Sequence, residues 1–319
     1  MSPPERGRCL SCIPLLRAGQ GTGMSNAMAE RARAAARQLG LHVADVTAAP
    51  RGRGTTFFAV TADEGPVVVK WYAGDGHGIT ERVARSDELR RRGHPTARTL
   101  VHGPSPGGYT LVQERMPGAP AVRGPGPEAL QELRAAVELQ AGAGEGGPRE
   151  QCWIAAAVRD DAMGWWAAAR ARSARAARLC DRLGAWLAAV PAPQPRTDLA
   201  FGDLNFTNVL VAGDRLSGIV DIDLLNAGDR CLDLARLAFE YELLRGRMRG
   251  GDGRIAGHRD DPVDVLAEDV LRISGRGGWR QAVAFIAVAR LGWRPPDGRR
   301  DPQEPTLRVT ERLMGRPYD

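Results

Sequence analysis

The stretch "LAFGDLNFTNVLVAGDRLSGIVDIDLLNAGDRCLDLA", residues 199–235, decides the fold. In it an apolar run ends at Gly202 and Asp203, and Asn208 follows five residues after the aspartate. A short apolar strand, a turn and a second strand then deliver Asp221. Three of the four asparagines of the chain lie in this stretch, which indicates retained chemistry in a sequence that is otherwise poor in this residue.

The spacing of these side chains suits phosphoryl transfer. A loop that presents a carboxylate and, five residues later, an amide can place the first beside a substrate hydroxyl and the second beside a metal ion. Magnesium prefers oxygen ligands and shares them with nucleotide phosphates. We therefore expect Asp203 to orient the hydroxyl and accept its proton, and Asn208 and Asp221 to hold Mg²⁺.

The segment "GPVVVKWYAG", residues 65–74, contains the only lysine among 44 lysine and arginine residues. Strand alternation places Lys70 on the face opposite Trp71, so its side chain can enter a cleft. A compact ammonium on a flexible stem can reach phosphate oxygens in a way that a planar guanidinium cannot copy. We expect a helix carboxylate to hold this lysine, with Glu81 preferred over Glu88.

With these residues in place, the chain resembles the aminoglycoside phosphotransferase and choline kinase type of small-molecule kinases, relatives of the protein-kinase fold. The resemblance covers roughly residues 41–245. "FGDLNFTN" is similar to the catalytic loop of that family, "GIVDID" to its metal-binding strand, "GDRCLDLA" to the segment that follows, and "VQERMPG" to its interlobe hinge.

The resemblance implies a role for each matching position. Asp203 would be the catalytic aspartate, Asn208 and Asp221 the Mg²⁺ ligands, and Lys70 the phosphate-binding lysine. The hinge backbone from Glu114 to Met116 would contact the adenine of ATP, or the base of GTP. Asp229 would brace the catalytic loop. One departure is Phe201, which stands where the family pattern has histidine.

The element pattern predicts an α+β, two-lobed, protein-kinase-like fold. A small, mostly antiparallel sheet with one helix is followed by a larger, mainly helical lobe. One helical pattern runs without a break over residues 162–190. The glycines Gly52 and Gly54 could cover phosphates, or could belong to an ordinary hairpin turn. The predicted segments are a disordered tail or over-extended start (1–27), a nucleotide-binding lobe (28–115), a hinge (116–120) and a catalytic, substrate-binding lobe (121–319).

Composition excludes several other classes of protein. The net charge is +6 with a pI near 9.5, but arginines are mixed with acidic residues and no nucleic-acid motif is present. No apolar run is long enough for a membrane span, and five scattered cysteines argue for a reducing compartment, so we expect a cytoplasmic protein. "GAGEGG", residues 142–147, follows a helix instead of a strand and therefore fails as a dinucleotide site.

The sequence thus predicts an ATP- or GTP-dependent phosphotransferase that modifies a hydroxyl group of a small molecule. The family resemblance favours an antibiotic such as an aminoglycoside, in resistance or self-protection. A kinase for choline, an amino acid or a sugar stays open, because the helical lobe that would bind the acceptor carries no readable motif. Phe201 motivates a further alternative, a nucleotide-binding module whose catalysis has lapsed.

Overall fold

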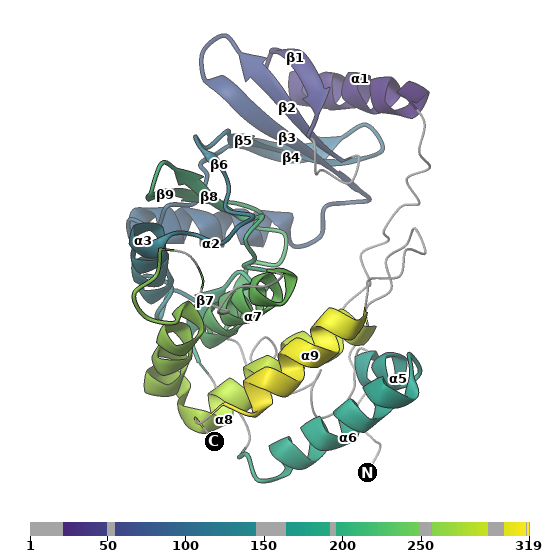
Figure 1. Cartoon of the computed structure of the whole chain (residues 1–319). Helices are drawn as coiled ribbons and strands as arrows, with labels where there is room; N and C mark the ends of the chain where they lie inside the picture. Colours follow the sequence, from purple (N-terminus) through teal and green to yellow (C-terminus); the bar gives the residue numbers. More distant parts are fainter. Residues whose placement is uncertain are drawn as a thin grey trace, which may run out of the picture.

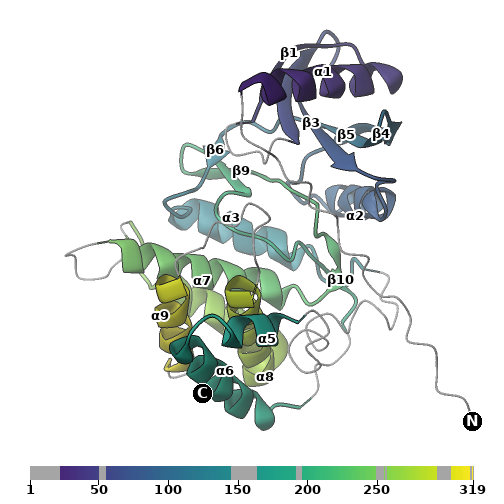
Figure 2. The same ribbon diagram turned by 90° about the vertical axis from the view of Figure 1, so that its right-hand side faces the viewer.

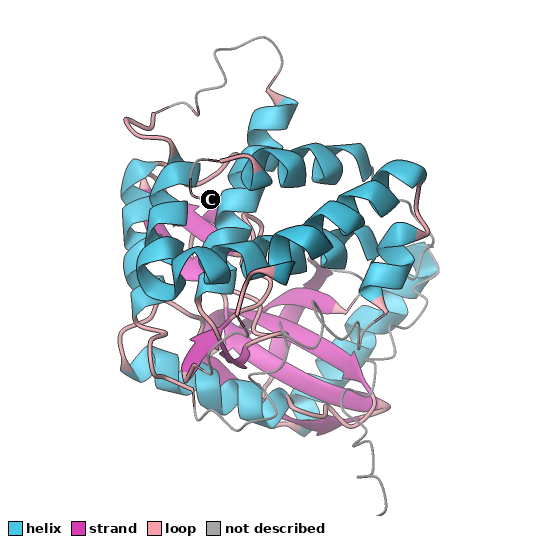
Figure 3. Ribbon diagram, turned by 90° about the horizontal axis from the view of Figure 1, so that it is seen from below, coloured by secondary structure: helices cyan, strands magenta, loops and turns pink. Residues whose placement is uncertain are grey.

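The computed structural model describes residues 22–49, 55–144, 164–191, 196–248, 255, 257–292, 303–316 and 318. The chain has a mixed α+β structure in which a strand-rich lobe sits on a helical lobe (Figure 1). We call the segment from α1 to β5 the N-lobe and the segment from β6 to α9 the C-lobe. Figure 3 shows the same division by class of element, with the large sheet on one side of most of the helices. The predicted fold class is therefore confirmed.

The N-lobe is a five-stranded antiparallel sheet with one helix before it and one helix inserted after its third strand. The sheet order is β1-β2-β3-β5-β4. Its elements are α1 (Thr22–Gln38), β1 (Val43–Ala48), β2 (Thr56–Thr61), β3 (Gly65–Ala73), α2 (Ile79–Arg91), β4 (Thr99–Ser105) and β5 (Gly108–Glu114).

The two faces of the central strand β3 have different environments. Val67 and Val69 are fully buried and pack in one cluster with Ala32 and Ala36 of α1. Lys70 alternates with them and therefore belongs to the opposite face of the sheet. In Figures 1 and 2, α1 covers the outer face of the sheet, whereas α2 lies between the sheet and the C-lobe. The lysine face is thus the one turned toward the C-lobe.

The C-lobe contains helices and two small sheets, one of order β6-β8-β9 and one of order β10-β7. Its elements are β6 (Ala119–Pro120), α3 (Pro127–Glu138), α5 (Trp165–Arg170), α6 (Ala174–Ala188), β7 (Asp198–Ala200), β8 (Val209–Ala212), β9 (Arg215–Ile219), β10 (Asn226–Gly228), α7 (Cys231–Arg247), α8 (Pro262–Gly292) and α9 (Gln303–Met314). None of the helices in the described part of the chain combines the length and the apolar composition that a membrane span requires.

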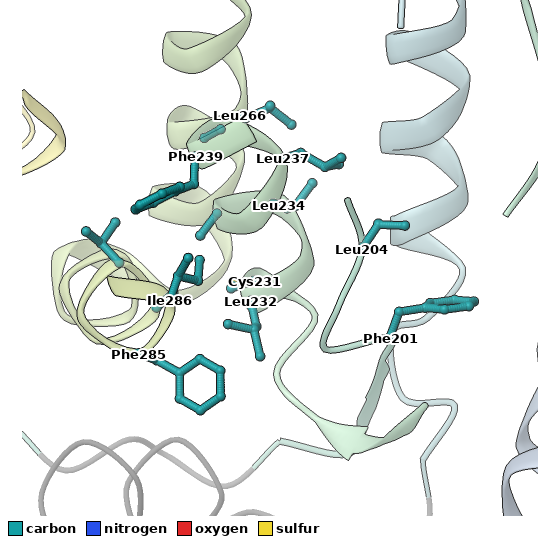
Figure 4. Close-up of a cluster of buried hydrophobic side chains, with 14 of the residues drawn as sticks. Phe201, Leu204, Cys231, Leu232, Leu234, Leu237, Phe239, Leu266, Phe285 and Ile286 are labelled. Carbon is teal, nitrogen blue, oxygen red and sulfur yellow. The ribbon is translucent and has the colours of Figure 1, made fainter. Parts of the chain in front are cut away.

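Helix α7 lies at the centre of the C-lobe core. Its residues Leu234, Leu237 and Tyr241 are almost fully buried and form the apolar stripe expected from their helical spacing. Figure 4 shows two of these side chains beside Leu204 of the adjoining loop and among residues of α8. Helix α8 bends at Gly275, where φ is 64°. The core thus anchors the loop that precedes β8.

Two helix boundaries differ from the sequence expectation. Helix α1 begins at Thr22, inside the segment 1–27 that the sequence assigns to a disordered tail or over-extended start. The pattern over 162–190 is divided into α5 and α6. Ser173 causes this division, because its side chain leaves the helical pattern and accepts a hydrogen bond from Ala176 N at 3.2 Å as an N-cap.

Candidate active site

Lys70 reaches from the N-lobe sheet to two aspartates of the C-lobe. Its Nζ donates to Asp221 Oδ1 at 2.6 Å and to Asp223 Oδ1 at 3.0 Å. The lysine side chain is only 12% exposed. Burial by itself lowers the pKa of Lys70, but Tyr72, Asp221 and Asp223 together outweigh burial and hold that pKa well above its ordinary value. The lysine therefore carries its charge throughout the physiological range.

Asp221 follows β9 and has an uncommon backbone conformation. Its φ is 73°, in the left-handed region that aspartate and asparagine tolerate better than other residues with a side chain. Burial has the largest single effect and raises the pKa of this carboxyl, but the charge and hydrogen bond of Lys70, together with hydrogen bonds from Asp223, outweigh it and lower the pKa below its ordinary value. Asp221 is therefore an ionised carboxylate at neutral pH.

The loop from Asp203 to Asn208 is closed by asparagine side chains. Asn208 Nδ2 donates to Asp203 O at 2.9 Å, and Asn205 Nδ2 donates to the same oxygen at 3.1 Å. The loop is joined to the strand that precedes Asp221, because Val220 N donates to Asn208 O at 2.9 Å. The structure thus brings together three of the residues that the sequence singles out, and Lys70 meets them from the other lobe.

The donor set around Asn208 and Asp221 fits a magnesium ion. The amide nitrogen of Asn208 is already used by Asp203, so its oxygen is the group left for a metal. Two carboxylates, Asp221 and Asp223, face the single ammonium of Lys70, and this leaves net negative charge in the cluster. Carboxylate and amide oxygens in a negatively charged site are what Mg²⁺ selects.

The Asp203 side chain is held from helix α7. Arg236 Nη2 donates to Asp203 Oδ1 at 2.7 Å, and the carboxylate remains 44% exposed. Arg236 also lies 3.8 Å from Glu240, which binds Arg290 of α8 at 2.7 Å. One oxygen of Asp203 is thus oriented by the core, and the exposed carboxylate can accept a proton from a substrate.

Asp233 of α7 braces the backbone at Phe201 and Gly202, just before Asp203, a contact that the family resemblance implies for Asp229. The buried Asp233 carboxylate accepts hydrogen bonds from Phe201 N at 2.7 Å and from Gly202 N at 2.9 Å. Burial raises its pKa to about 7, against the lowering effect of these two N–H groups. Asp229 instead accepts from Cys231 N at 2.9 Å and Ser274 Oγ at 3.0 Å, so it joins α7 to α8. The motif "GDRCLDLA" contains both aspartates, and the bracing contact belongs to Asp233 and not to Asp229.

Phe201 packs against a histidine of the other lobe. Its ring stacks on His94, with the ring centroids 5.5 Å apart and the planes at 18°. Both side chains are buried. Next to this pair, Ile219 N donates to Pro95 O at 2.7 Å. Phe201, which precedes the Asp203–Asn208 loop, is therefore well packed against His94 of the segment that follows α2.

Of the predicted hinge residues, Glu114 is the last residue of β5, and Met116 lies two residues further along the chain, on the way to the C-lobe. The Glu114 carboxylate accepts a hydrogen bond from Arg98 N at 2.7 Å, so it is used within the N-lobe. Met116 packs so closely on Gly218 of β9 that a Cβ atom there would lie 2.8 Å from Met116 Cε. The hinge therefore rests on the hairpin that leads to Asp221.

The structure does not support the expected pairing of Lys70 with Glu81. Glu81 is 69% exposed and lies 3.8 Å from Arg85 on its own helix. The alternative, Glu88, pairs with Arg92 at 2.7 Å. Both carboxylates lie away from the buried face of α2, and neighbouring arginines one turn away hold them. Gly52 and Gly54, the candidates for covering phosphates, lie outside the described residues.

Comparisons with known proteins agree with this geometry. The sequence model of the phosphotransferase enzyme family matches residues 45–264. A sequence search among curated proteins gave no match.

Solved structures resemble most of the chain. Aminoglycoside phosphotransferase APH(4)-Ia matches with a TM-score of 0.63 and 17% identity, over 88% of this chain and 95% of that protein. A thermostable mutant of that enzyme, in ternary complex with ADP and hygromycin B, gives 0.60 and 18%, over 88% and 96%. Aminoglycoside phosphotransferase APH(3'')-Id from Streptomyces rimosus ATCC10970 gives 0.53 and 19%, over 84% and 99%. At these identities the likeness concerns the fold.

Proposed function

Since the chain belongs to the phosphotransferase enzyme family and is a small-molecule kinase, we propose that it transfers the γ-phosphoryl group of ATP or GTP to a hydroxyl group of its acceptor. We further propose an antibiotic, an aminoglycoside first, as this acceptor. A kinase for choline, an amino acid or a sugar is the alternative, and the acceptor screen below separates the two.

The observation that carries the proposal is the meeting of Lys70 with Asp221 across the two lobes, at 2.6 Å. Asp221 is tied through Val220 to Asn208, which in turn binds the backbone of Asp203. The ammonium of β3 and the carboxylate that follows β9 are thus in contact, and the Asp203–Asn208 loop is bonded to the residue before that carboxylate. Phosphoryl transfer depends mainly on such positioning and on neutralisation of charge.

Each residue has a task in this reaction. Lys70 would bind phosphate oxygens, and Asn208 and Asp221 would hold Mg²⁺, which neutralises phosphate charge when it is bound. Asp203 would orient the acceptor hydroxyl and take its proton, while Arg236 fixes one of its oxygens. These are the roles that the family resemblance implies, and the donor types and their contacts support them.

The base of the nucleotide would lie against the hinge. Arg115 N already donates to Pro66 O at 3.0 Å and Glu114 N to Arg98 O at 2.9 Å, so the backbone carbonyl of Glu114 and the backbone N–H of Met116 are the candidates for contacts with the base. Adenine and guanine demand different donors and acceptors on this backbone. The proposal therefore includes both donors, and competition between ATP and GTP decides between them.

The choice of an antibiotic rests on the structural neighbours. A similar structure, aminoglycoside phosphotransferase APH(4)-Ia, was solved with ADP and hygromycin B. Labelled ATP or GTP with Mg²⁺ and a panel of aminoglycosides, choline, amino acids and sugars tests the acceptor directly. Transfer to an aminoglycoside supports the first candidate, and transfer to choline or another metabolite replaces it with the alternative.

Asp203→Asn tests the proposed chemistry. The substitution keeps the shape of the side chain but removes the proton acceptor, so turnover should fall by roughly 10²-fold or more, in the range that general-base catalysis supplies. Nucleotide affinity, measured by calorimetry, should remain within a few-fold of the wild type. Asp214→Asn, in the exposed turn between β8 and β9, is the matched control and should leave turnover unchanged. Equal turnover in Asp203→Asn and the wild type would reject the assigned role.

A further inference from the structure

Helix α2 gives Lys70 no acidic partner. Its acidic residues are Glu81, Asp87 and Glu88. The first and the last are paired with arginines of the same helix, and Asp87 is exposed. The buried face of α2 consists of Ile79, Val83, Ser86 and Leu89, which are apolar or neutral. If Lys70 is to hold phosphates in a fixed place, the acidic side chain that orients its ammonium must therefore come from an element other than α2.

Asp223 has the contacts of such a group. Lys70 Nζ lies 3.0 Å from Asp223 Oδ1, and Tyr72 OH donates to the same oxygen at 2.6 Å. Lys70 and Tyr72 are two residues apart on β3 and share the face of the sheet that is turned to the C-lobe. We call these two hydrogen bonds the β3 latch. They fix a C-lobe carboxylate to the N-lobe strand at two donors.

The hydroxyl of Tyr72 restrains the position of the Asp223 carboxylate in the β3 latch. A carboxylate held only by a flexible lysine could follow that lysine to a phosphate, whereas a carboxylate also held by a tyrosine is anchored to the strand itself. The Lys70 side chain is 12% exposed and Tyr72 is partly buried, whereas the Asp223 side chain is 40% exposed, so both donors come from the more buried side of the contact. Asp221, in contrast, binds Lys70 alone among the side chains of β3.

We propose that Asp223, anchored by the Tyr72 hydroxyl, is the positioning residue of Lys70 and takes the place of a glutamate on α2. Asp221 can then turn to a metal ion while Asp223 keeps the ammonium directed at the phosphates. The proposal rests on the proposed function, because the orientation of Lys70 affects catalysis only in a chain that binds a nucleotide.

The lone lysine makes the proposal measurable. Protein labelled with ¹⁵N-lysine has one side-chain Nζ resonance, which reports the surroundings of Lys70 without assignment. Spectra would be recorded for the free protein and for its complex with Mg²⁺ and the non-hydrolysable analogue AMP-PNP. ATP hydrolysis, with water as the acceptor, would be followed in parallel so that no knowledge of the natural acceptor is needed.

Asp223→Asn should shift the Nζ resonance in both states and should lower kcat about tenfold, the effect of one lost charge-assisted contact. The KM for ATP should stay within about threefold, because the substitution also removes a negative charge that repels the phosphates. A disrupted fold would raise KM as well. This separation of kcat from KM is the signature of a positioning residue.

Tyr72→Phe removes only the hydroxyl and should lower kcat by about threefold, as expected for a hydrogen bond that acts indirectly. If Tyr72 acts through Asp223, the double variant should be no slower than Asp223→Asn alone. Additive losses would show that Tyr72 works independently and would overturn the anchoring part of the proposal.

Two variants on α2 complete the design. Glu81→Gln tests the competing glutamate, and Asp87→Asn is the matched control for loss of one carboxylate; both should leave the resonance and kcat unchanged. A loss of activity in Glu81→Gln with an unaltered Asp223→Asn would return the task to α2 and overturn the proposal. A wild type that neither binds nucleotide nor hydrolyses ATP would reject the proposed function itself, and the positioning role with it.

Discussion

His94 is buried against Phe201, and neither ring nitrogen has a hydrogen-bond partner among the described residues. Burial lowers the pKa of its imidazole to about 4. The pKa of an exposed histidine is about 6.5, so folding favours the neutral ring. This contribution to stability is fully present above pH 6.5 and is lost as the pH falls through about 4.

His94→Phe should make the protein less sensitive to acid. Between pH 7 and pH 4 the wild type should lose about 3 kcal/mol more unfolding free energy than the variant, which corresponds to the difference between the two pKa values. Urea unfolding at a series of pH values measures this difference. His77→Phe, at an exposed position, is the control and should follow the wild type. Parallel pH profiles for the wild type and His94→Phe would contradict the burial argument.

Sequence reasoning selected Lys70, Asp203, Asn208 and Asp221, and the structure brings these four residues together. Rarity and spacing made this possible, since a single lysine and a cluster of asparagines are visible without coordinates. Their chemical roles stay predictions. The metal and phosphate assignments require the ligand-binding measurements described above.

The partners of these residues could not be predicted as well. Glu81 was chosen for Lys70 from its place on a helix, but the rotation of α2 turns Glu81 to solvent. Asp233 was missed because Asp229, four residues earlier in the same motif, has the same chemistry. Only the packing of α7 shows which carboxylate is buried beneath the loop and which one is bound by Ser274.

At the scale of elements, α9 is fixed to α7 by one buried carboxylate. Glu242 of α7 is 1% exposed and binds Arg245 at 2.6 Å. Arg312 of α9 lies 2.8 Å from it, and Arg316, just beyond that helix, lies 2.5 Å from it. Three guanidinium groups thus share one buried acid; Arg245 and Arg316 also contact Asp261, whereas Arg312 is bound to α7 through Glu242.

Glu242→Gln should destabilise the protein by about 3 kcal/mol, because the substitution leaves these arginines without their buried counter-charge. Chemical unfolding measures the loss. Glu304→Gln is the matched control on α9, since Glu304 is 45% exposed and its pairs with Arg175 and Arg308 should contribute less than about 1 kcal/mol. Equal losses in the two variants would show that burial of Glu242 has no special effect.

The elements themselves were largely predictable. The sequence pattern predicted a small, mostly antiparallel sheet followed by a mainly helical lobe, and the structure contains both. Boundaries were less reliable, because the 162–190 pattern has the same apolar period on both sides of Ser173. A capping serine that divides a helix is recognised only when its side chain is seen to bond the backbone.

At the scale of the whole molecule, several contacts join the lobes besides the hinge. Arg85 of α2 donates to Asn226 of β10 at 2.5 Å, and Arg92 donates to Ala141 O at 2.8 Å. The division into two lobes was predictable from strand-rich and helix-rich halves of the sequence. These cross-lobe contacts were not, because they join residues with no common motif.

Mg²⁺ and ATP should stabilise the wild type against heat, because the proposed ligands of the phosphates come from both lobes. At a nucleotide concentration 100-fold above Kd, linkage predicts about 2.7 kcal/mol and a rise in Tm of roughly 5 °C. Lys70→Met and Asp221→Asn should each reduce this rise, and removal of Mg²⁺ with a chelator should reduce it in the wild type. A full rise in both variants would show that the nucleotide binds elsewhere.

The positive φ of Asp221 narrows the choice of residue at that position beyond what metal chemistry requires. Glutamate offers the same carboxylate, but it lacks the short side chain that makes a left-handed backbone tolerable. Drift from aspartate to glutamate at this site would therefore cost the protein both ligand geometry and conformational energy. Asparagine is a neutral replacement of similar shape that tolerates the same backbone conformation, so a defect in Asp221→Asn can be attributed to the loss of the carboxylate and not to backbone strain.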